Sequence, residues 1–429
     1  LKFMIKNKST IGIVGLGYVG LPLALEFGKK TKVVGFDINK ERILELTKGE
    51  DRNSEVLISK IKNPKNIEFS YDKTKLKNCN IFIVTVPTPV DNKNLPDLTL
   101  LKKACEIVGK YIKKNSIFIL ESTVYPGCTE KFCVPILERV SKLKFNKDFY
   151  CGYSPERINP GDSKHNFKNI VKITSGSNDQ TSRKINNLYK SVFKITHQTD
   201  SIIIAEAAKV IENIQRDLNI ALVNELSIIL DKLNVNTKKV IEAAGTKWNF
   251  QKFYPGLVGG HCISVDPYYL TYVAKLNNYI PKVILAGRKI NNHMKLEVVK
   301  KFLSAIKRSK INTKKIKILV MGISFKENVS DLRNSQALEV VKILLDKKFN
   351  LDIYDPLIEQ KKIKLKNKNI YLKKILTKKR TYDAILILTP HDKIKSISSK
   401  KLIKTCKKKF VLFDIKNYLN LKIKEYIKL

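Results

Sequence analysis

Residues 9–38 read STIGIVGLGYVGLPLALEFGKKTKVVGFDI, a pattern that predicts a strand, a glycine turn, a helix and a second strand. Gly15-Leu16-Gly17-Tyr18-Val19-Gly20 follows the apolar run 11–14 and opens the helical segment. Such glycines permit a tight turn and a close backbone approach to a pyrophosphate, which the helix N-terminus attracts. The second strand, 32–36, ends at Asp37, whose carboxylate suits a ribose 2′-hydroxyl and repels a 2′-phosphate. The stretch therefore predicts a Rossmann-like domain that binds NAD.

Two further apolar runs follow at the spacing of strand–helix–strand units. Residues 80–90 (NIFIVTVPTPV) and 116–127 (SIFILESTVYPG) both end in Thr, Ser and Pro. Ligands of open parallel sheets bind beyond the carboxyl ends of the strands. We therefore expect Thr88 and Thr123 to lie where the cofactor binds.

Length and cysteine content bound the class of protein. A chain of 429 residues with 43% hydrophobic residues is expected to form two or three domains. No uncharged apolar run reaches about 18 residues, and no apolar core follows the first ten residues, so we expect neither a membrane span nor a secretion signal. The seven cysteines are odd in number and scattered, which favours a cytoplasmic, reducing location.

The formal net charge of +43 invites a nucleic-acid interpretation. The lysines, however, are dispersed along the whole chain and reflect a bias in composition. We therefore expect no specific nucleic-acid partner, while the positive field could steer an anionic substrate.

Residues 201–233 carry helical periodicity without Gly or Pro and predict a helix roughly 50 Å long. Such a helix would join two domains, and its surplus apolar surface predicts a homodimer. Lys209 and Asn213, four residues apart, share one of its faces. A second α/β unit begins near Lys314, where only Gly322 follows the first strand and the pyrophosphate fingerprint is absent. Lys326 and Arg333 are the available cations there.

Residues 257–266 read LVGGHCISVD and place a cysteine beside paired glycines, a pattern that serves no packed core. Oxidation of an aldehyde to an acid by NAD needs a nucleophile that first forms a tetrahedral adduct, and a thiolate forms a thiohemiacetal and then a thioester. A free thiol with a pKa near 8.5 is only a few per cent ionised at pH 7. His261, Lys209 or a helix N-terminus would have to favour the thiolate of Cys262.

Seven motifs then carry a resemblance to a known family: GLGYVG, VPTP, ESTVYPG, SPERINPGD, AEAAKVIEN, GGHCISVDP and FKENVSDLR. In this order and spacing the chain resembles the UDP-glucose/UDP-N-acetylhexosamine 6-dehydrogenases over nearly its full length. The resemblance implies an α/β protein with two Rossmann-like doubly wound parallel-sheet domains joined by a long central helix. It also implies oxidation of a sugar C6 hydroxyl to a carboxylate with two NAD. We expect an NAD-binding domain over 1–199, a central helical domain with the cysteine loop over 200–305, and a UDP-sugar-binding domain over 306–429.

The resemblance also implies roles for single residues. Cys262 matches the nucleophile, Lys209 and Asn213 the pair that stabilises negative charge on oxygen, Asp266 a residue that organises water or base, and Glu156 the residue that assists thioester hydrolysis. Thr123 is expected to act beside them. The cofactor positions are Gly15, Gly17, Tyr18, Val19, Gly20, Asp37, Arg42, Thr88, Thr123 and Arg333. The substrate positions are Glu156, Arg157, Asn159, Lys209, Asn213, Phe253, Tyr254, Gly259 and Lys326. No metal site is expected.

Two departures narrow the substrate. UDP-glucose enzymes typically carry a large apolar residue after Ser-Pro-Glu and a Pro-Lys before the loop aspartate, where this chain has Arg157 to Pro160 and Ser264-Val265. This pattern resembles enzymes that make UDP-GlcNAc or UDP-GalNAc uronic acids for surface polysaccharides, and Arg157 and Asn159 could donate to an acetamido group.

The alternatives are a UDP-glucose or UDP-ManNAc 6-dehydrogenase, a two-electron β-hydroxyacid dehydrogenase, and an inactive basic nucleic-acid-binding protein. The β-hydroxyacid enzyme would leave Cys262 and the second α/β unit unexplained.

Overall fold

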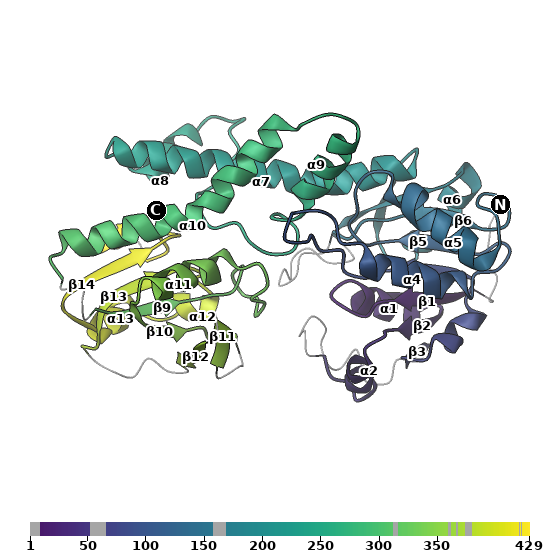
Figure 1. Ribbon diagram of the computed structural model, residues 1–429, viewed down its shortest axis with the longest axis horizontal. Coiled ribbons are helices and arrows are strands. Elements are labelled where there is room, and N and C mark those ends of the chain that lie inside the picture. Colours follow the sequence, from purple (N-terminus) through teal and green to yellow (C-terminus); the bar gives the residue numbers. More distant parts are fainter. Residues whose placement is uncertain are drawn as a thin grey trace. The chain divides into compact units, whose positions relative to one another are not determined.

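The computed structural model describes residues 9–51, 66–157, 169–311, 316–358, 362–365, 368–373, 380–419, 421 and 423–429. The chain divides into two compact units. The N-terminal unit comprises Leu1–Glu212 and Tyr268–Ile280, and the C-terminal unit comprises Asn213–Pro267 and Pro281–Leu429. Each unit is built on its own twisted sheet (Figure 1).

The sheet of the N-terminal unit has the strand order β3-β2-β1-β4-β5-β6-β7-β8. Its neighbours pair in parallel except β6 and β7, which are antiparallel. The first six strands in this order follow the arrangement of dinucleotide-binding sheets. The strands are β1 (Thr10–Val14), β2 (Lys32–Phe36), β3 (Ile67–Ser70), β4 (Ile81–Val84), β5 (Ile117–Leu120), β6 (Tyr150–Tyr153), β7 (Val171–Gly176) and β8 (Ile195–Gln198).

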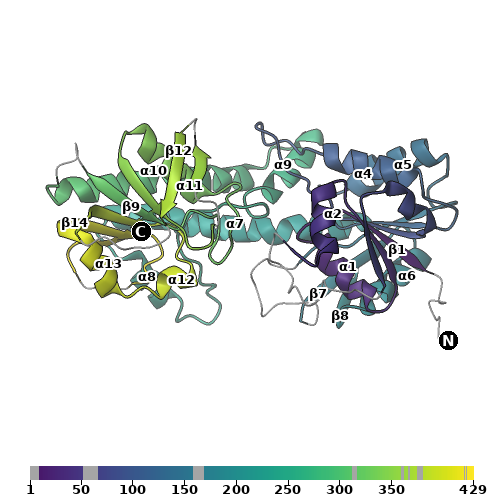
Figure 2. The same ribbon diagram turned by 90° about the horizontal axis from the view of Figure 1, so that it is seen from below.

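Helices cover both faces of this sheet, because alternate side chains of the buried strands point to opposite sides. Ile11 and Ile13 pack on the face of α1, α2 and α6, whereas Phe82 and Val84 pack on the face of α4 and α5. Figure 2 shows α4 and α5 on the side of the sheet opposite α1 and α6. The helices are α1 (Gly20–Gly28), α2 (Lys40–Thr47), α4 (Thr99–Gly109), α5 (Val134–Ser141), α6 (Asp179–Lys190) and α9 (Asp266–Leu276), with a 3-10 helix (Lys73–Asn78) and a π-helical turn (Thr129–Cys133).

Helix α7 (Ile202–Lys232) confirms the predicted long helix and is 31 residues long. Its first turns belong to the N-terminal unit and the rest to the C-terminal unit. Several of its large apolar side chains are exposed: Ile203, Ile204, Ile211, Leu222, Leu226 and Ile229.

The sheet of the C-terminal unit has the order β11-β12-β10-β9-β13-β14-β15. Only the β11–β12 pair among these strands is antiparallel. The strands are β9 (Lys317–Met321), β10 (Asn350–Tyr354), β11 (Lys362–Leu365), β12 (Lys368–Lys373), β13 (Tyr382–Ile387), β14 (Cys406–Asp414) and β15 (Tyr426–Lys428). The helices are α8 (Thr237–Ala244), α10 (Lys282–Arg308), α11 (Gln336–Asp346), α12 (Asp392–Lys395) and α13 (Ser399–Thr405).

This second sheet is also buried on both faces. Ile318 and Val320 pack with α10 and α11, and Leu319 and Met321 pack with α12 and α13. A parallel sheet that carries helices on both faces is the doubly wound arrangement. The predicted fold class, two Rossmann-like units with a long central helix, is therefore confirmed.

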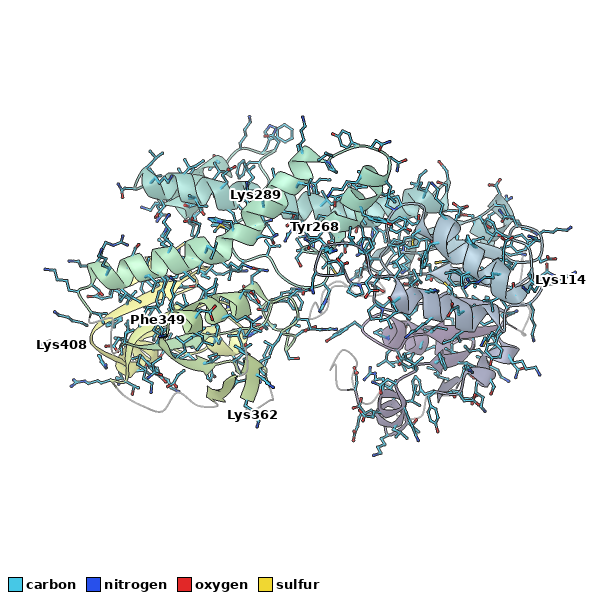
Figure 3. All side chains as sticks on the ribbon, viewed as in Figure 1. Lys114, Tyr268, Lys289, Phe349, Lys362 and Lys408 are labelled. Atoms are coloured by element: carbon cyan, nitrogen blue, oxygen red, sulfur yellow. The ribbon has the colours of Figure 1, made fainter. Side chains whose placement is uncertain are left out.

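Exposed lysines occur in both units. Lys114 in the N-terminal unit and Lys362 and Lys408 in the C-terminal unit are all exposed (Figure 3). Lys172 is a clear exception, because its side chain is 1% exposed.

Candidate active site

The glycine turn after β1 has the shape that a pyrophosphate needs. Gly15 adopts φ +100°, and its N–H donates to the carbonyl of Phe36 at 2.8 Å. A Cβ added at Gly20 would lie 1.8 Å from the carbonyl oxygen of Gly15, so α1 can begin here only with glycine. A Cβ added at Gly17 would meet nothing within 4 Å. The backbone at Gly17 therefore faces open space in which a ligand can approach, and these residues fit NAD.

Asp37, at the end of β2, is held against this turn. Its Oδ2 accepts the N–H of Leu16 at 2.8 Å, and its Oδ1 accepts the N–H of Asn39 at 2.9 Å. Arg42 is buried, donates from Nε to the carbonyl of Leu16 at 3.0 Å and pairs with Asp51 at 2.7 Å. Arg42 thus braces the turn that carries the predicted cofactor glycines. Tyr18 and Val19 are partly exposed on the turn itself.

The ends of β4 and β5 come together as their sequences predict. The hydroxyl of Thr88 donates to the carbonyl of Thr123 at 2.6 Å. The phenolic hydroxyl of Tyr269, on α9, donates to the carbonyl of Thr88. Sequence reasoning missed Tyr269, for which the aromatic pair after Asp266-Pro267 was the available indication.

Glu156 follows β6, and a buried ion pair holds the backbone next to it. Lys172 on β7 contacts Glu121 at 2.7 Å and also donates to the carbonyl of Pro155 at 2.9 Å. The hydroxyl of Tyr189 donates to the same carboxylate. Glu121 and Lys172 are at most 1% exposed, so water solvates neither charged group. The backbone immediately before Glu156 is therefore fixed by a cation that the sequence analysis missed, although a lysine inside an apolar strand was the visible sign.

Arg157, expected to contact the substrate, has partners within the N-terminal unit. Its Nε donates to Glu212 of α7 at 2.9 Å, and its Nη1 donates to the carbonyl of Val171 at 2.8 Å. Any hydrogen bond from Arg157 to an acetamido group would have to add to these contacts or replace them. Asn159 lies outside the described residues.

Lys209 and Asn213 lie one turn apart on α7 and are 8% and 4% exposed. One turn earlier, Glu206 accepts the N–H groups of Gly127 and Thr129 at 2.5 and 2.8 Å. Burial raises the pKa of Glu206 to about 7, against the hydrogen bonds from Thr129 and Gly127 that favour its ionised form. The start of α7 is thereby fastened to the segment after β5.

Cys262 is the exposed member of the seven cysteines, whereas the other six are buried. Its carbonyl accepts the N–H groups of Val265 and Asp266 at 3.0 and 2.8 Å, and this turn leads directly into α9. Asp266 is 1% exposed, and its Oδ2 accepts a hydrogen bond from Nδ2 of Asn213 at 2.5 Å. Three of the predicted catalytic residues are therefore neighbours in the C-terminal unit.

The paired glycines before Cys262 are explained by close packing. Gly260 adopts φ +92°, and a Cβ there would lie 2.6 Å from the ring of Phe325. A Cβ at Gly259 would lie 2.5 Å from the carbonyl oxygen of Asn334. The cysteine loop therefore lies directly on the segment that carries Lys326 and Arg333, which only glycine permits.

His261 has a carboxylate partner that the sequence did not indicate. Its Nε2 lies 3.0 Å from Oδ2 of Asp331, which Arg333 also contacts at 2.6 Å. Burial alone would raise the pKa of Asp331. Hydrogen bonds from His261 and Arg333 outweigh this and hold the pKa well below its usual range. His261 and Arg333 thus share one anion.

The aromatic loop before the glycines is anchored by buried amides. Asn224 of α7 bonds both to the N–H of Gly256 (2.8 Å) and to its carbonyl (3.1 Å). Asn224 also donates to Asn291 of α10 at 2.8 Å. Phe253 is partly exposed and Tyr254 is 48% exposed just upstream of this anchor. The loop therefore presents aromatic side chains from a fixed backbone.

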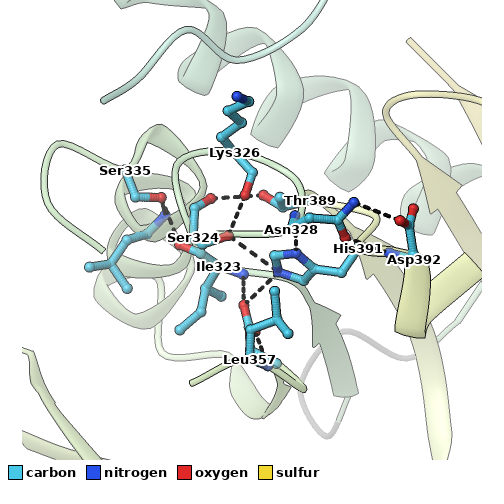
Figure 4. A network of polar contacts seen from close by, with 11 residues as sticks. Ile323, Ser324, Lys326, Asn328, Ser335, Leu357, Thr389, His391 and Asp392 are labelled. Atoms are coloured by element: carbon cyan, nitrogen blue, oxygen red, sulfur yellow. Dashed lines mark hydrogen bonds and ion pairs between the residues drawn. The ribbon is translucent and has the colours of Figure 1, made fainter. Parts of the chain in front are cut away.

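Lys326 lies in the segment that follows β9. This segment bonds to the residues that follow β13, and Figure 4 shows the side chain of Lys326 leading away from that network. Among the described residues, no three His, Cys, Asp or Glu side chains are grouped so as to hold a metal ion. Nor is any helix in the described ranges long and apolar enough to cross a membrane.

Comparisons with known proteins agree with these features. Three models of the UDP-glucose/GDP-mannose dehydrogenase family match the chain: the NAD binding domain at residues 9–193, the central domain at 204–293 and the UDP binding domain at 319–421. The UDP-N-acetyl-D-glucosamine 6-dehydrogenase of Salmonella typhi is 49% identical over 410 residues, which cover 95% of this chain and 96% of that one. The enzyme of the same name from Pseudomonas aeruginosa is 47% identical, with 96% of this chain and 97% of that one covered.

Among solved structures, the UDP-D-ManNAc dehydrogenase of Pyrococcus horikoshii aligns with a TM-score of 0.87 at 30% identity, over 98% of both chains. The expected NAD-dependent dehydrogenase is therefore confirmed, with its cofactor and its family. The chain belongs to the UDP-glucose/GDP-mannose dehydrogenase family.

Proposed function

We propose that the protein oxidises the C6 hydroxyl of a UDP-N-acetylhexosamine, UDP-GlcNAc or UDP-GalNAc, to the uronic acid with two NAD. The observation that carries the chemistry is Cys262, the one exposed cysteine of seven, in a turn fixed beside Asp266 and Asn213. The names of the relatives that are 49% and 47% identical support the acetamido sugar.

The proposed reaction has two oxidations. Bound NAD would accept the hydride that leaves C6 in each of them. Between them, the thiolate of Cys262 adds to the C6 aldehyde, and the carbonyl oxygen becomes the oxyanion of a thiohemiacetal. The second oxidation converts this adduct to a thioester. Water then adds to the thioester, the C–S bond breaks, the thiolate leaves and the carboxylate forms.

The residues have distinct proposed tasks. Lys209 and Asn213 donate to the oxygen that becomes negative, and each preorganised donor in a dry site contributes roughly 3 kcal/mol. Asp266 holds the amide of Asn213 in position, as their 2.5 Å contact suggests. Glu156, assisted by Thr123, takes a proton from the attacking water. The N-terminus of α9, just after Cys262, favours a negative charge on its sulfur.

The proposed binding residues of the cofactor and of the UDP-sugar each come from both units. Gly15, Gly17, Tyr18, Val19, Gly20, Asp37, Arg42, Thr88, Thr123 and Arg333 are proposed for the cofactor. Glu156, Arg157, Asn159, Phe253, Tyr254, Gly259 and Lys326, with Lys209 and Asn213, are proposed for the UDP-sugar. We place the domain boundaries near residues 199 and 305. We also propose that the enzyme acts in the cytoplasm, in a pathway that makes surface polysaccharides.

A homodimer through α7 is part of the proposal. Ile211, Leu222 and Ile229 of this helix are each about half exposed, at 53%, 55% and 47%. Apolar side chains that recur on a long helix are covered at low cost by a second copy of the same helix, in a two-fold interface.

The test is steady-state NADH formation by the purified protein with UDP-GlcNAc, UDP-GalNAc, UDP-ManNAc and UDP-glucose. A site that hydrogen-bonds an acetamido group leaves its own polar groups unpaired with UDP-glucose, at about 1–3 kcal/mol each. We therefore expect kcat/KM for UDP-GlcNAc or UDP-GalNAc to exceed that for UDP-glucose at least about tenfold, with two NADH per sugar.

Equal use of UDP-glucose would reject the acetamido specificity. One NADH per sugar would reject the thioester route. A preference for UDP-ManNAc would move the assignment to the activity named for the Pyrococcus structure.

A further inference from the structure

A buried histidine organises the end of β13 in the C-terminal unit. The side chain of His391 is 0% exposed, and its Nε2 lies 3.2 Å from Oδ2 of Asp355, which follows β10. The same Nε2 lies 3.2 Å from Oγ of Ser324, which follows β9. One ring therefore contacts residues that follow two neighbouring strands (Figure 4).

The hydrogen bonds define which ring nitrogen carries the proton. The backbone N–H of Asn328 donates to Nδ1 at 2.8 Å, so Nδ1 is the acceptor. Oγ of Ser324 already donates to the carbonyl of Lys326 at 2.8 Å, so it accepts from Nε2–H, as does Asp355. His391 is a neutral ring with a donor on one side and an acceptor on the other.

The segment around Lys326 is held at several points, of which the hydrogen bond from Asn328 to Nδ1 is one. Asn328 adopts φ +61°, in the left-handed region, and its side chain exchanges two hydrogen bonds with Asp392, at 2.7 and 2.9 Å. Next to it, Glu327 pairs with Lys395 at 2.6 Å. On the other side, the carbonyl of Ser324 accepts from Thr389 at 2.9 Å. Residues on both sides of Lys326 are thus tied to the segment after β13.

We propose that His391 is a positioning residue for UDP-sugar binding, because its Nδ1 fixes the backbone that aims Lys326. The proposal rests on the proposed function for the part in which Lys326 contacts the UDP-sugar. The ring itself is 0% exposed, so a ligand cannot reach it. Its effect on binding therefore passes through the hydrogen bond to Asn328. It does not pass through Asp355, nor through Ser324, whose hydroxyl donates to the carbonyl of Lys326 with or without the ring.

Two substitutions separate the two sides of the ring. In His391→Asn the amide oxygen takes the place of Nδ1 and keeps an acceptor for Asn328. In His391→Gln the longer amide reaches the position of Nε2, keeps the contacts with Asp355 and Ser324, and loses the acceptor for Asn328. Tyr382→Phe, at the opposite end of β13, removes the hydrogen bond to Asp352 (2.9 Å) and is the control for a loss of stability alone.

The expected result is a split between binding and turnover. His391→Gln should raise KM for the UDP-sugar, and Kd for UDP measured by calorimetry, about tenfold, while kcat and KM for NAD stay within about twofold. His391→Asn should restore both constants to within about threefold of the wild type. Tyr382→Phe should lower the unfolding temperature and leave both constants unchanged.

Equal losses in the Asn and Gln variants would overturn the positioning role. So would a loss of UDP binding in all three variants, Tyr382→Phe included, that follows the fall in unfolding temperature. So would an unchanged Kd for UDP in His391→Gln. If the wild type oxidises no UDP-sugar, the proposed function fails, but the UDP titrations of the same variants still decide the role of His391.

Discussion

The two units build the same turn after their first strand and then use it differently. Gly15 donates to Phe36 at 2.8 Å and Gly322 donates to Tyr354 at 2.9 Å, each joining the first strand to the end of the second. The next N–H, of Leu16 or Ile323, bonds to Asp37 or Asp355 at 2.8 Å in both units. The turns therefore match in backbone and in the position of the acidic residue.

After this turn the two units differ in structure. In the N-terminal unit the chain enters α1 at Gly20, and the backbone at Gly17 is open. In the C-terminal unit the chain continues irregularly from 323 to 335, and the matching carboxylate is 0% exposed against His391. Burial favours the protonated form of Asp355, but hydrogen bonds from His391 and from Ile323 hold the pKa of Asp355 below its usual value. A ribose can reach the first carboxylate and not the second, so one dinucleotide per chain is expected.

The largest effect should come from Cys262→Ala, which removes the proposed nucleophile and tests whether NAD and UDP still bind without it. We expect acid formation to fall about a thousandfold or more, with NAD and UDP binding retained, because the thiol acts after binding. Stopped-flow NADH formation and calorimetry measure the two parts. Cys406→Ala is the matched control, since that thiol is buried and burial raises its pKa to about 12. Acid production by the Cys262 variant near the wild-type rate would remove the cysteine from the mechanism.

A smaller effect should be a difference in the pH dependence of stability between Glu206 in the N-terminal unit and Asp355 in the C-terminal unit. The folded pKa of Glu206 lies above its ordinary value of 4.5, so the folded N-terminal unit binds an extra proton between about pH 4.5 and 7. Stability contributed at this site therefore falls as pH rises through that window, by about 3 kcal/mol at most, and is flat above it. The folded pKa of Asp355 is lowered, so its contribution is present above about pH 4 and is lost only below it.

Denaturant unfolding of the wild type and of Glu206→Gln, compared at several pH values, measures this difference. The stability gap should widen from pH 5 to pH 7, in favour of the Gln variant. For Asp355→Asn the gap to the wild type should be constant over the same range. A constant gap for Glu206→Gln would contradict the raised pKa.

The smallest effect tests the open side of the first turn. Gly17→Ala should leave the unfolding temperature unchanged, because the added Cβ meets no protein atom within 4 Å. It should raise KM for NAD about tenfold, since a methyl pressed against a bound group costs about 1–3 kcal/mol. Gly256→Ala in the C-terminal unit is the control: its Cβ meets only Lys416, at 3.8 Å, and KM for NAD should not change. An unaltered KM in the first variant would show that the cofactor does not approach Gly17.

The sequence predicts one unit better than the other for a physical reason. Glycine spacing and strand-terminal Asp37 are local signals, so the NAD turn could be predicted directly. Helical periodicity without Gly or Pro over residues 201–233 predicted α7 in the same way. In the second unit the partners of the turn lie far apart in sequence, as Ser324 and His391 do. No periodicity announces such a pair.

The same limit applies to the candidate site. The sequence pointed to Cys262, Asp266 and Asn213, and the structure places them together in one unit. It did not point to Asp331 as the partner of His261, nor to Glu212 as the partner of Arg157, because both contacts depend on tertiary packing. Their charges were visible, but with 39 acidic residues no single one stands out.

The burial of Lys172 gives the protein an internal reporter. Amine-labelling reagents reach solvent-exposed lysines, but an ammonium that is 1% exposed and paired with Glu121 is shielded while the N-terminal unit is closed. Modification of Lys172 therefore requires opening of β7 and of the backbone that carries Glu156. Peptide mass spectrometry of labelling at Lys172, against a surface lysine such as Lys114, would time that opening in the native protein and show whether bound NAD slows it.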